Sequence, residues 1–272
     1  MTAGHKEIDA ERMRVFGTGV DFSKTAADYA EHRHGFPPAF FDLLGARAWA
    51  RRRQSAVDLG CGTGTLARGL ARLGMNVIGV DPAREMINEA RRLDHAAGVN
   101  VTYREAKAEA TGLASSSVDL VTAGQCWHWF DRKAAARHVR QVLKPNGRVV
   151  IAHFDWLPMQ GNVAKATERL ILSYNPVWAG AGGTGIYPQW LVDLGNAGFQ
   201  SLETASFDIT IPYTHAAWRG RIRASAGVAA SLDDAAVRTF DIDLAKILTR
   251  DFPTDPLEVP HRVWLATGIA VK

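Results

Sequence analysis

Asp58-Leu59-Gly60-Cys61-Gly62-Thr63-Gly64 links a short apolar run, residues 55–59, to a segment whose leucines recur on one helical face. Glycines let the backbone turn sharply after a strand and approach a ligand closely, while the N-terminus of the next helix directs amide groups toward it. The stretch therefore predicts a ligand-binding loop at the carboxyl end of a parallel strand.

Apolar strands and amphipathic helices continue to alternate on the carboxyl side of this loop. Strands are predicted over residues 76–81, 99–103, 118–122 and 147–154, and two more over 206–211 and 261–270. Consecutive parallel strands are joined by right-handed crossovers, which place helices on both faces of the sheet. The pattern predicts an α/β fold with a seven-stranded, mostly parallel sheet.

A single domain with four segments is expected. Residues 1–53 are predicted to form N-terminal lid helices, over 23–33 and 39–52, and residues 54–155 the ligand-binding core. Residues 156–190 break the alternation after the fifth strand and are predicted to be an insertion that caps a substrate. Residues 191–272 complete the sheet and add a helical substrate segment.

The net charge raises the question of a nucleic-acid partner, since the 272-residue chain carries a formal charge of +4. The one tight basic cluster, residues 51–53, precedes a strand and so lies away from the edge where ligands bind. No basic run is interleaved with aromatic residues, as single-strand binders require. No nucleic-acid partner is expected.

The remaining composition indicates a cytoplasmic protein without membrane association. No apolar stretch is long enough to span a bilayer, and residues 1–14 lack the apolar centre of a signal peptide. Two cysteines make no disulfide framework, which suits a reducing compartment. No metal site is expected, because His32 and His34 lack further ligands at metal spacing. No oligomeric state is predicted.

The spacing of the glycines excludes two common phosphate-binding loops. A dinucleotide fingerprint needs glycine at its first, third and sixth positions, and the sixth position counted from Gly60 is Thr65. A P-loop ends in Gly-Lys-Ser/Thr, whereas Gly64 is followed by Thr65 and Leu66. The loop is therefore not predicted to hold a pyrophosphate.

Two acidic residues indicate which chemical groups a different ligand would carry at its two ends. Asp58 precedes Gly60 by two residues, where a carboxylate favours the ammonium of an amino-acid-like group over a phosphate. Asp81 ends the next strand, where it can accept both hydroxyls of a ribose. The pair indicates a ligand with an amino acid at one end and a nucleoside at the other.

These residues resemble the cofactor motif of class I S-adenosylmethionine-dependent methyltransferases. The resemblance extends to Gly79-Val80-Asp81, to residues 117–121 and to residues 143–148. Residues 125–131 and 218–225 are similar to the small-molecule branch that includes trans-aconitate methyltransferase-like proteins. The resemblance implies a Rossmann-like fold and an enzyme that uses S-adenosyl-L-methionine and releases S-adenosyl-L-homocysteine.

The resemblance also implies which residues contact the cofactor. Tyr29 and Arg33 would reach the methionyl carboxylate, and Met86 would pack on adenine. The family's usual acid after the third strand aligns with Lys107, so Glu109 or the backbone alone would hold the adenine. The predicted cofactor-binding residues are Tyr29, Arg33, Asp58, Gly60, Cys61, Gly62, Thr63, Gly64, Asp81, Pro82, Met86, Ala108, Glu109, Gln125 and Cys126.

The acceptor is predicted to bind at the carboxyl ends of the strands. His128 is the candidate catalytic base for an acceptor that carries a proton; otherwise it is a wall residue, since a carboxylate acceptor needs no base. Arg219 and Arg223 share a helical face and could pair with an acidic acceptor. The predicted substrate residues are Trp127, His128, Trp129, Tyr174, Tyr187, Arg219 and Arg223.

Three functions stay open at this point. The leading one is methyl transfer to a small molecule, at a carboxylate or hydroxyl oxygen. A nucleic-acid or protein methyltransferase is the first alternative, although the chain lacks a base-flipping Asn/Asp-Pro-Pro-Tyr tetrapeptide and a concentrated basic surface. A protein that binds S-adenosylmethionine without catalysis is the second.

Overall fold

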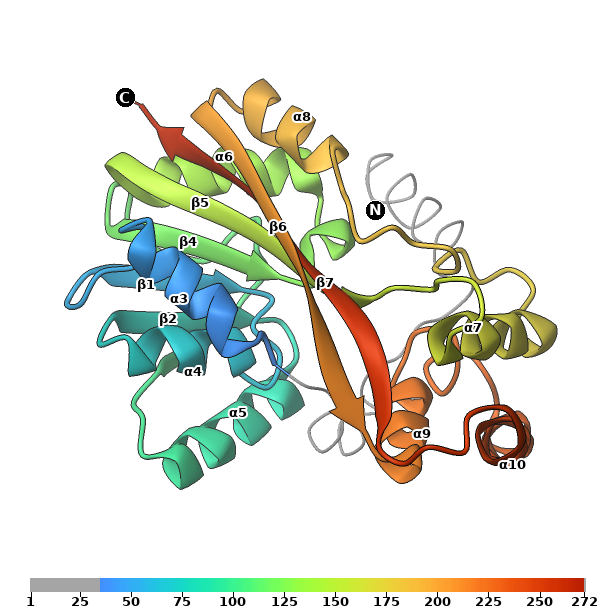
Figure 1. Cartoon of the computed structure of the whole chain (residues 1–272). Helices are drawn as coiled ribbons and strands as arrows, with labels where there is room; N and C mark the ends of the chain where they lie inside the picture. Colours follow the sequence, from blue (N-terminus) through green and yellow to red (C-terminus); the bar gives the residue numbers. More distant parts are fainter. Residues whose placement is uncertain (1–34, 272) are drawn as a thin grey trace, which may run out of the picture. The chain divides into compact units, whose positions relative to one another are not determined.

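A computed structural model describes residues 35–271 of the chain (Figure 1). The predicted helix over 23–33, with Tyr29 and Arg33, lies outside the described residues.

Seven strands form one sheet in the order β3-β2-β1-β4-β5-β7-β6. Their bounds are β1 Ser55–Leu59, β2 Asn76–Asp81, β3 Thr102–Glu105, β4 Val118–Gly124, β5 Leu143–Trp156, β6 Gln200–Tyr213 and β7 Leu257–Ala270. The first five pair in parallel, and the order reverses between β1 and β4. This confirms the predicted Rossmann-like, mostly parallel sheet, in which ligands bind at the point of reversal.

The helices follow the predicted alternation, with shorter bounds in places. They are α3 Pro38–Ala46, α4 Thr65–Arg72, α5 Arg84–Ala97, α6 Arg132–Val142, α7 Val163–Tyr174, α8 Gln189–Asn196, α9 His215–Arg223 and α10 Asp234–Asp251, with a 3-10 turn, η2, over Trp127–Trp129. The helix predicted over 39–52 was wrong at its end. Ala48 has a φ of 54°, a left-handed conformation that an α-helix cannot continue through.

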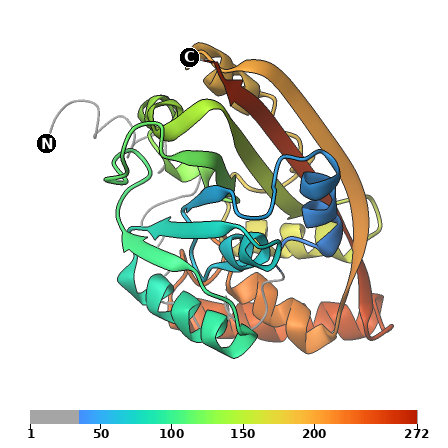
Figure 2. The same cartoon turned by 90° about the vertical axis from the view of Figure 1, so that its left-hand side faces the viewer.

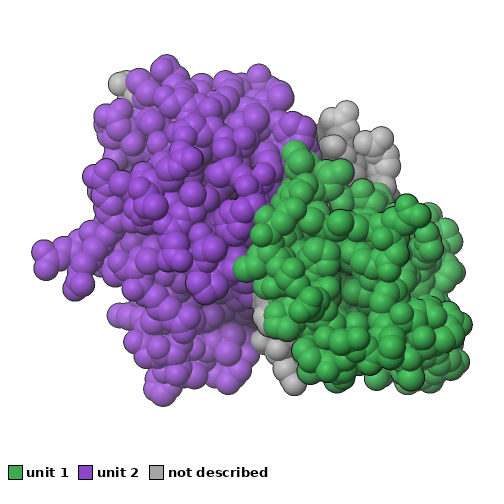
Figure 3. Space-filling view, in the orientation of Figure 1, with its two compact units in different colours: residues 1–33, 155–186, 208–262 green, residues 34–154, 187–207, 263–272 purple. Residues whose placement is uncertain are grey.

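The chain divides into two compact units, coloured separately in Figure 3. Unit 2 comprises residues 34–154, 187–207 and 263–272, and so contains the glycine loop and both acids. Among the described residues, unit 1 comprises 155–186 and 208–262, and takes in most of the predicted cap insertion.

Alternate residues of β1 face opposite sides of the sheet. Val57 and Leu59 belong to a buried cluster with Val139 of α6 and Leu194 of α8. Burial of each such side chain contributes about 1.5–3 kcal/mol. Since side chains alternate along a strand, Asp58 faces the other side, where α4 packs and the backbone of Ala67 donates a hydrogen bond to it. Helix α5 lies along β2 and β3 (Figures 1 and 2).

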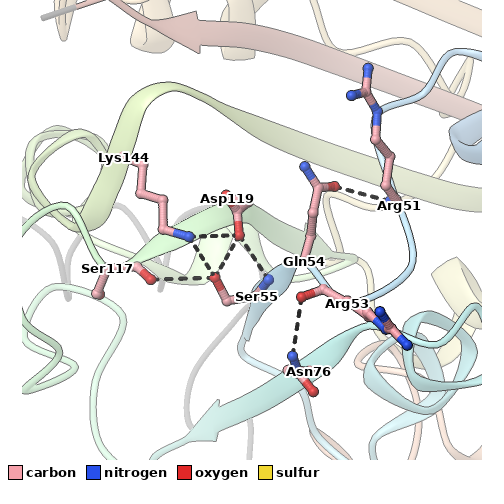
Figure 4. A network of polar contacts seen from close by, with 8 residues as sticks. All are labelled: Arg51, Arg53, Gln54, Ser55, Asn76, Ser117, Asp119 and Lys144. Atoms are coloured by element: carbon pink, nitrogen blue, oxygen red, sulfur yellow. Dashed lines mark hydrogen bonds and ion pairs between the residues drawn. The ribbon is translucent and has the colours of Figure 1, made fainter.

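A polar network joins β1, β4 and β5 where β1 and β5 begin (Figure 4). The Oδ2 atom of Asp119 accepts hydrogen bonds from the backbone and hydroxyl of Ser55, at 2.8 and 2.7 Å, and from Lys144 at 2.9 Å. Partial burial alone would raise the pKa of Asp119, but these donors lower it overall. The network links the N-terminal ends of these strands, at the end of the sheet opposite the glycine loop.

Candidate functional site

The glycine loop of unit 2 turns through left-handed conformations. Gly60 and Gly62 have φ of 58° and 52°. A Cβ added to Gly60 would come within 2.9 Å of Cys126, so this glycine permits close packing. A Cβ added to Gly62 would meet nothing within 4 Å. The loop therefore has open space beside Gly62, and a side chain there would enter it.

Asp58 is a buried carboxylate, and the hydrogen-bond donors described for it, the hydroxyl of Thr122 and the backbone of Ala67, are uncharged. Asp58 is only 1% exposed. The hydroxyl of Thr122 on β4 donates a 2.8 Å hydrogen bond to its Oδ1 atom. Burial raises the pKa of Asp58 to about 7, with hydrogen bonds from Thr122 and Ala67 opposing the rise. A cationic ligand group would favour the ionised form.

Asp81 ties the loop to the end of β2. Its two oxygens accept hydrogen bonds from the backbone N–H groups of Gly62, at 2.8 Å, and of Ala83, at 2.9 Å. Burial raises the pKa of this carboxyl as well. A carboxylate has about four acceptor positions, so each oxygen keeps one for a ligand hydroxyl.

A second group of residues supports the loop through hydrogen bonds and a buried ion pair. The sequence did not predict it. Arg68 of α4 donates to the carbonyl of Thr63 at 2.9 Å and forms a buried 2.7 Å ion pair with Asp94 of α5. The hydroxyl of Tyr103 donates to the other oxygen of Asp94, at 2.7 Å. The burial of Arg68 is visible only in the structure, because the residue looks like an ordinary helix-surface arginine in the sequence.

The residues predicted to surround the adenine differ in burial. Met86 and Ala108 are buried, whereas Pro82 and Lys107 are exposed. One carboxylate oxygen of Glu109 accepts a 2.7 Å hydrogen bond from the backbone of Asp131. Glu109 is thus held by the start of α6, which limits any shift toward the position of Lys107.

Gln125 and Cys126 follow β4 and close the loop's other side. Gln125 has a φ of 62°, and its side-chain amide donates to the carbonyl of Phe154. The thiol of Cys126 donates a hydrogen bond to the carbonyl of Leu59, with a sulfur–oxygen distance of 3.0 Å. Burial raises the pKa of the Cys61 thiol, which favours its protonated form.

The three aromatic residues of η2 have different surroundings. Trp127 is fully buried and its indole N–H donates to Asp193 at 3.0 Å, so it packs in the core of unit 2. His128 and Trp129 are half-buried, with ring centroids 5.0 Å apart. Of these three residues, His128 and Trp129 are the two that retain accessible surface.

An aromatic stack behind His128 was not predicted. The imidazole of His153, on β5, lies 5.8 Å from that of His128 and stacks on Tyr187 at 3.8 Å. The indole N–H of Trp190 donates to His153 Nε2 at 3.1 Å. The structure thus brings predicted residues His128 and Tyr187 to one imidazole that sits inside an ordinary apolar strand pattern.

The other predicted substrate residues lie in unit 1. Arg219 donates to Asp241 through Nε at 3.0 Å, and Arg223 donates to the same carboxylate at 2.8 Å. An internal carboxylate therefore competes for both arginines. The hydroxyl of Tyr174 donates to Asp243 at 2.8 Å, which raises the pKa of the phenol.

Two features are absent from residues 35–271. No helix in this range is both long and apolar enough to cross a membrane. No group of three or more His, Cys, Asp or Glu side chains in the same range could hold a metal ion.

Residues 57–151 match the family model described as "Methyltransferase domain". This segment runs from β1 through most of β5, and so contains the loop, Asp58 and Asp81.

Individual relatives share the same region. An uncharacterised methyltransferase of Schizosaccharomyces pombe is 34% identical over 134 residues, which is 49% of this chain and 52% of the relative. A ubiquinone biosynthesis O-methyltransferase of Azorhizobium caulinodans is 31% identical over 151 residues, 55% of this chain and 60% of the relative. The chain thus spans about half the length of the curated relatives it matches.

The solved structures extend the likeness to most of the chain. A proposed type II methyltransferase from Anaeromyxobacter dehalogenans is 25% identical, with a TM-score of 0.63 over 88% of this chain and 98% of that one.

Proposed function

Because residues 57–151 form a methyltransferase domain of the class I S-adenosylmethionine-dependent family, we propose that this chain methylates a small molecule at a carboxylate or hydroxyl oxygen. The cofactor of this family is S-adenosyl-L-methionine, and its product is S-adenosyl-L-homocysteine. The observation that carries the proposal is that two buried carboxylates, Asp58 and Asp81, flank a loop that has open space beside Gly62.

The residues of unit 2 fit the cofactor at three places. Asp58 offers a buried carboxylate to the ammonium of the methionyl group, and Asp81 keeps acceptor positions for the ribose hydroxyls. Met86 and Ala108 offer apolar surface to adenine. Tyr29 and Arg33 are proposed for the methionyl carboxylate.

When bound, the cofactor supplies an electrophilic methyl group on a sulfonium sulfur. Transfer is an in-line displacement, so positioning of the acceptor and exclusion of water provide much of the acceleration. His128 accepts the proton of a hydroxyl acceptor, whereas a carboxylate acceptor needs only alignment. Trp129 provides the wall beside it, and Tyr187 stacks on the neighbouring His153.

Labelled methyl transfer tests this proposal. The full chain is incubated with methyl-labelled cofactor and a panel of small acids, phenols, alcohols and amines. Label in acids or hydroxyl compounds supports it, and label only in amines, protein or RNA contradicts it. For a hydroxyl acceptor, His128→Gln should lower kcat about 100-fold with little change in cofactor affinity, and unchanged turnover would remove the role as base.

A further inference from the structure

The loop over residues 106–113 of unit 2 follows β3 and carries two residues proposed for the adenine. It begins beside Asp81, whose backbone carbonyl accepts a 3.2 Å hydrogen bond from the N–H of Ala106. Ala108 is buried in the core of the unit, and Glu109 is held by the start of α6. The positions of Ala108 and Glu109 therefore depend on what holds this loop.

The far end of the loop is bound to α6 through an imidazole. The backbone N–H of Thr111 donates to Nε2 of His138 at 3.1 Å, and the hydroxyl of Thr111 lies 2.8 Å from the same nitrogen. That hydroxyl accepts a 3.3 Å hydrogen bond from the backbone of Leu113. Thr111 is only 1% exposed, so loss of the imidazole acceptor would leave a buried N–H unsatisfied.

These contacts fix the protonation state of His138. A backbone N–H can only donate, so Nε2 offers its lone pair and the ring proton lies on Nδ1. The hydroxyl of Thr111 then donates to the same lone pair. An imidazolium carries a proton on both nitrogens, and would direct its Nε2–H at the N–H of Thr111. The neutral imidazole holds the loop, and the charged one repels it.

Charged groups around His138 act in different directions. Partial burial lowers its pKa below the ordinary value of 6.5, and the carboxylate of Glu109 opposes that decrease. Arg104 of β3 binds the carbonyl side of the same loop. Of the elements packed on α6, α8 carries Asp193, which pairs with the arginine at the start of α6, and η2 carries His128. His138 is therefore neutral at pH 8 and becomes charged in acid.

We infer that neutral His138 is a positioning residue for the cofactor's adenine, and that its protonation releases residues 107–111 and weakens cofactor binding. It acts through Thr111, on the loop that carries Ala108 and Glu109. By reciprocity, bound cofactor opposes protonation of the imidazole. This inference rests on the proposed function, since the loop affects binding only if it contacts the cofactor.

Nitrogen NMR of the full chain labelled with 15N-histidine tests the imidazole directly. The signals of His138 are those missing from His138→Gln. At pH 8 they should show the Nδ1–H tautomer, with an unprotonated Nε2. Their titration midpoint should lie below 6.5, and lower still with S-adenosylhomocysteine bound. An Nε2–H tautomer, or a midpoint that bound S-adenosylhomocysteine leaves unchanged, would contradict the inference.

Calorimetry measures the effect on binding, with S-adenosylhomocysteine titrated into the parent and His138→Gln at pH 8 and pH 5.5. The side-chain oxygen of glutamine can accept in place of Nε2 and does not titrate. The variant should bind within about threefold of the parent at pH 8. On acidification its Kd should rise about 3- to 10-fold less than that of the parent, as expected for one neutral hydrogen bond. Protonation of Asp58 affects both proteins alike.

Two further variants complete the comparison. His95→Gln removes an exposed histidine of α5 in the same unit and should reproduce the pH response of the parent. His138→Ala lacks an acceptor and should already bind about 3- to 10-fold more weakly at pH 8. If the alanine variant does not fold, His138→Gln carries the comparison.

The outcomes separate this inference from the proposed function. Normal binding to the parent at pH 8, with equal pH responses in the parent and His138→Gln, would contradict this inference alone. No binding of S-adenosylhomocysteine to the parent at pH 8 would contradict the proposed function.

Discussion

The hydroxyl of Thr122 donates a 2.8 Å hydrogen bond to Oδ1 of Asp58, across the pairing of β4 with β1. Both residues are buried, and the register aligns them directly. The bond stabilises the ionised carboxylate, which burial disfavours. Thr122 is thus a positioning residue for the group that is proposed to meet the cofactor's ammonium.

Thr122→Val should weaken S-adenosylmethionine binding near neutral pH. Removal of a donor to a charged group costs about 1.5–3 kcal/mol, so an increase in Kd of about tenfold or more is expected. Calorimetry measures it, with Thr122→Ser as the variant that restores affinity and Thr239→Val, at an exposed position, as the control. Equal affinity in Thr122→Val and the parent would show that the bond does not tune Asp58.

The elevated pKa of Asp58 predicts an unusual dependence of stability on pH. The group has a pKa of about 7 in the folded, ligand-free chain and 3.8 as its ordinary value. As pH rises from about 4 to about 7, the unfolded chain loses this proton first, and folding becomes less favourable. The whole difference corresponds to about 4 kcal/mol of unfolding free energy.

Asp58→Asn removes that dependence, because an amide does not titrate. Denaturant unfolding at pH 5 and pH 8 measures it. The variant should gain stability relative to the parent at pH 8 and little at pH 5. A constant difference at both pH values would contradict the elevated pKa.

Two glycines of the loop should respond differently to alanine. Gly60→Ala meets Cys126 at 2.9 Å and should lose about 2–4 kcal/mol of unfolding free energy. Gly62→Ala meets nothing within 4 Å and should lose only about 1–2 kcal/mol through its left-handed backbone. Its methyl group enters the open space, so cofactor affinity should still fall, by about tenfold or more. Undiminished affinity in Gly62→Ala would mean that the cofactor does not approach the loop there.

A substitution in the Asp119 network should change stability and leave cofactor affinity unchanged. Asp119→Asn should lower the unfolding free energy by about 1–2 kcal/mol and leave cofactor affinity unchanged, because the network lies at the other edge of the sheet. The pKa of Asp119 is lowered, so its contribution should disappear as pH falls below the ordinary range of an aspartate. A change in cofactor affinity would place this network in the binding machinery.

Local features of the sequence were sufficient for the sheet and for the loop. The glycine spacing, Asp58 and Asp81 all lie within 24 residues, so one strand–turn–helix–strand unit fixes their relation. The end of α3 was missed because the left-handed Ala48 leaves no mark in hydrophobic spacing.

Contacts between distant residues could not be predicted. Arg68 and Tyr103 meet at Asp94 through packing of α5 along the sheet, and Trp190 meets His153 from a helix 37 residues away. The three arginines of α9 look alike in sequence, and only the positions of Asp241 and Trp156 distinguish them.

The most direct test of the central claim is calorimetric titration of S-adenosylmethionine into the parent chain, Asp58→Asn and the exposed-site control Asp42→Asn at pH 8. The account predicts saturable binding to the parent and to Asp42→Asn, and a Kd at least about 100-fold higher for Asp58→Asn, as expected for loss of a buried charge pair. No binding to the parent at millimolar cofactor, or equal affinity in Asp58→Asn, would contradict it.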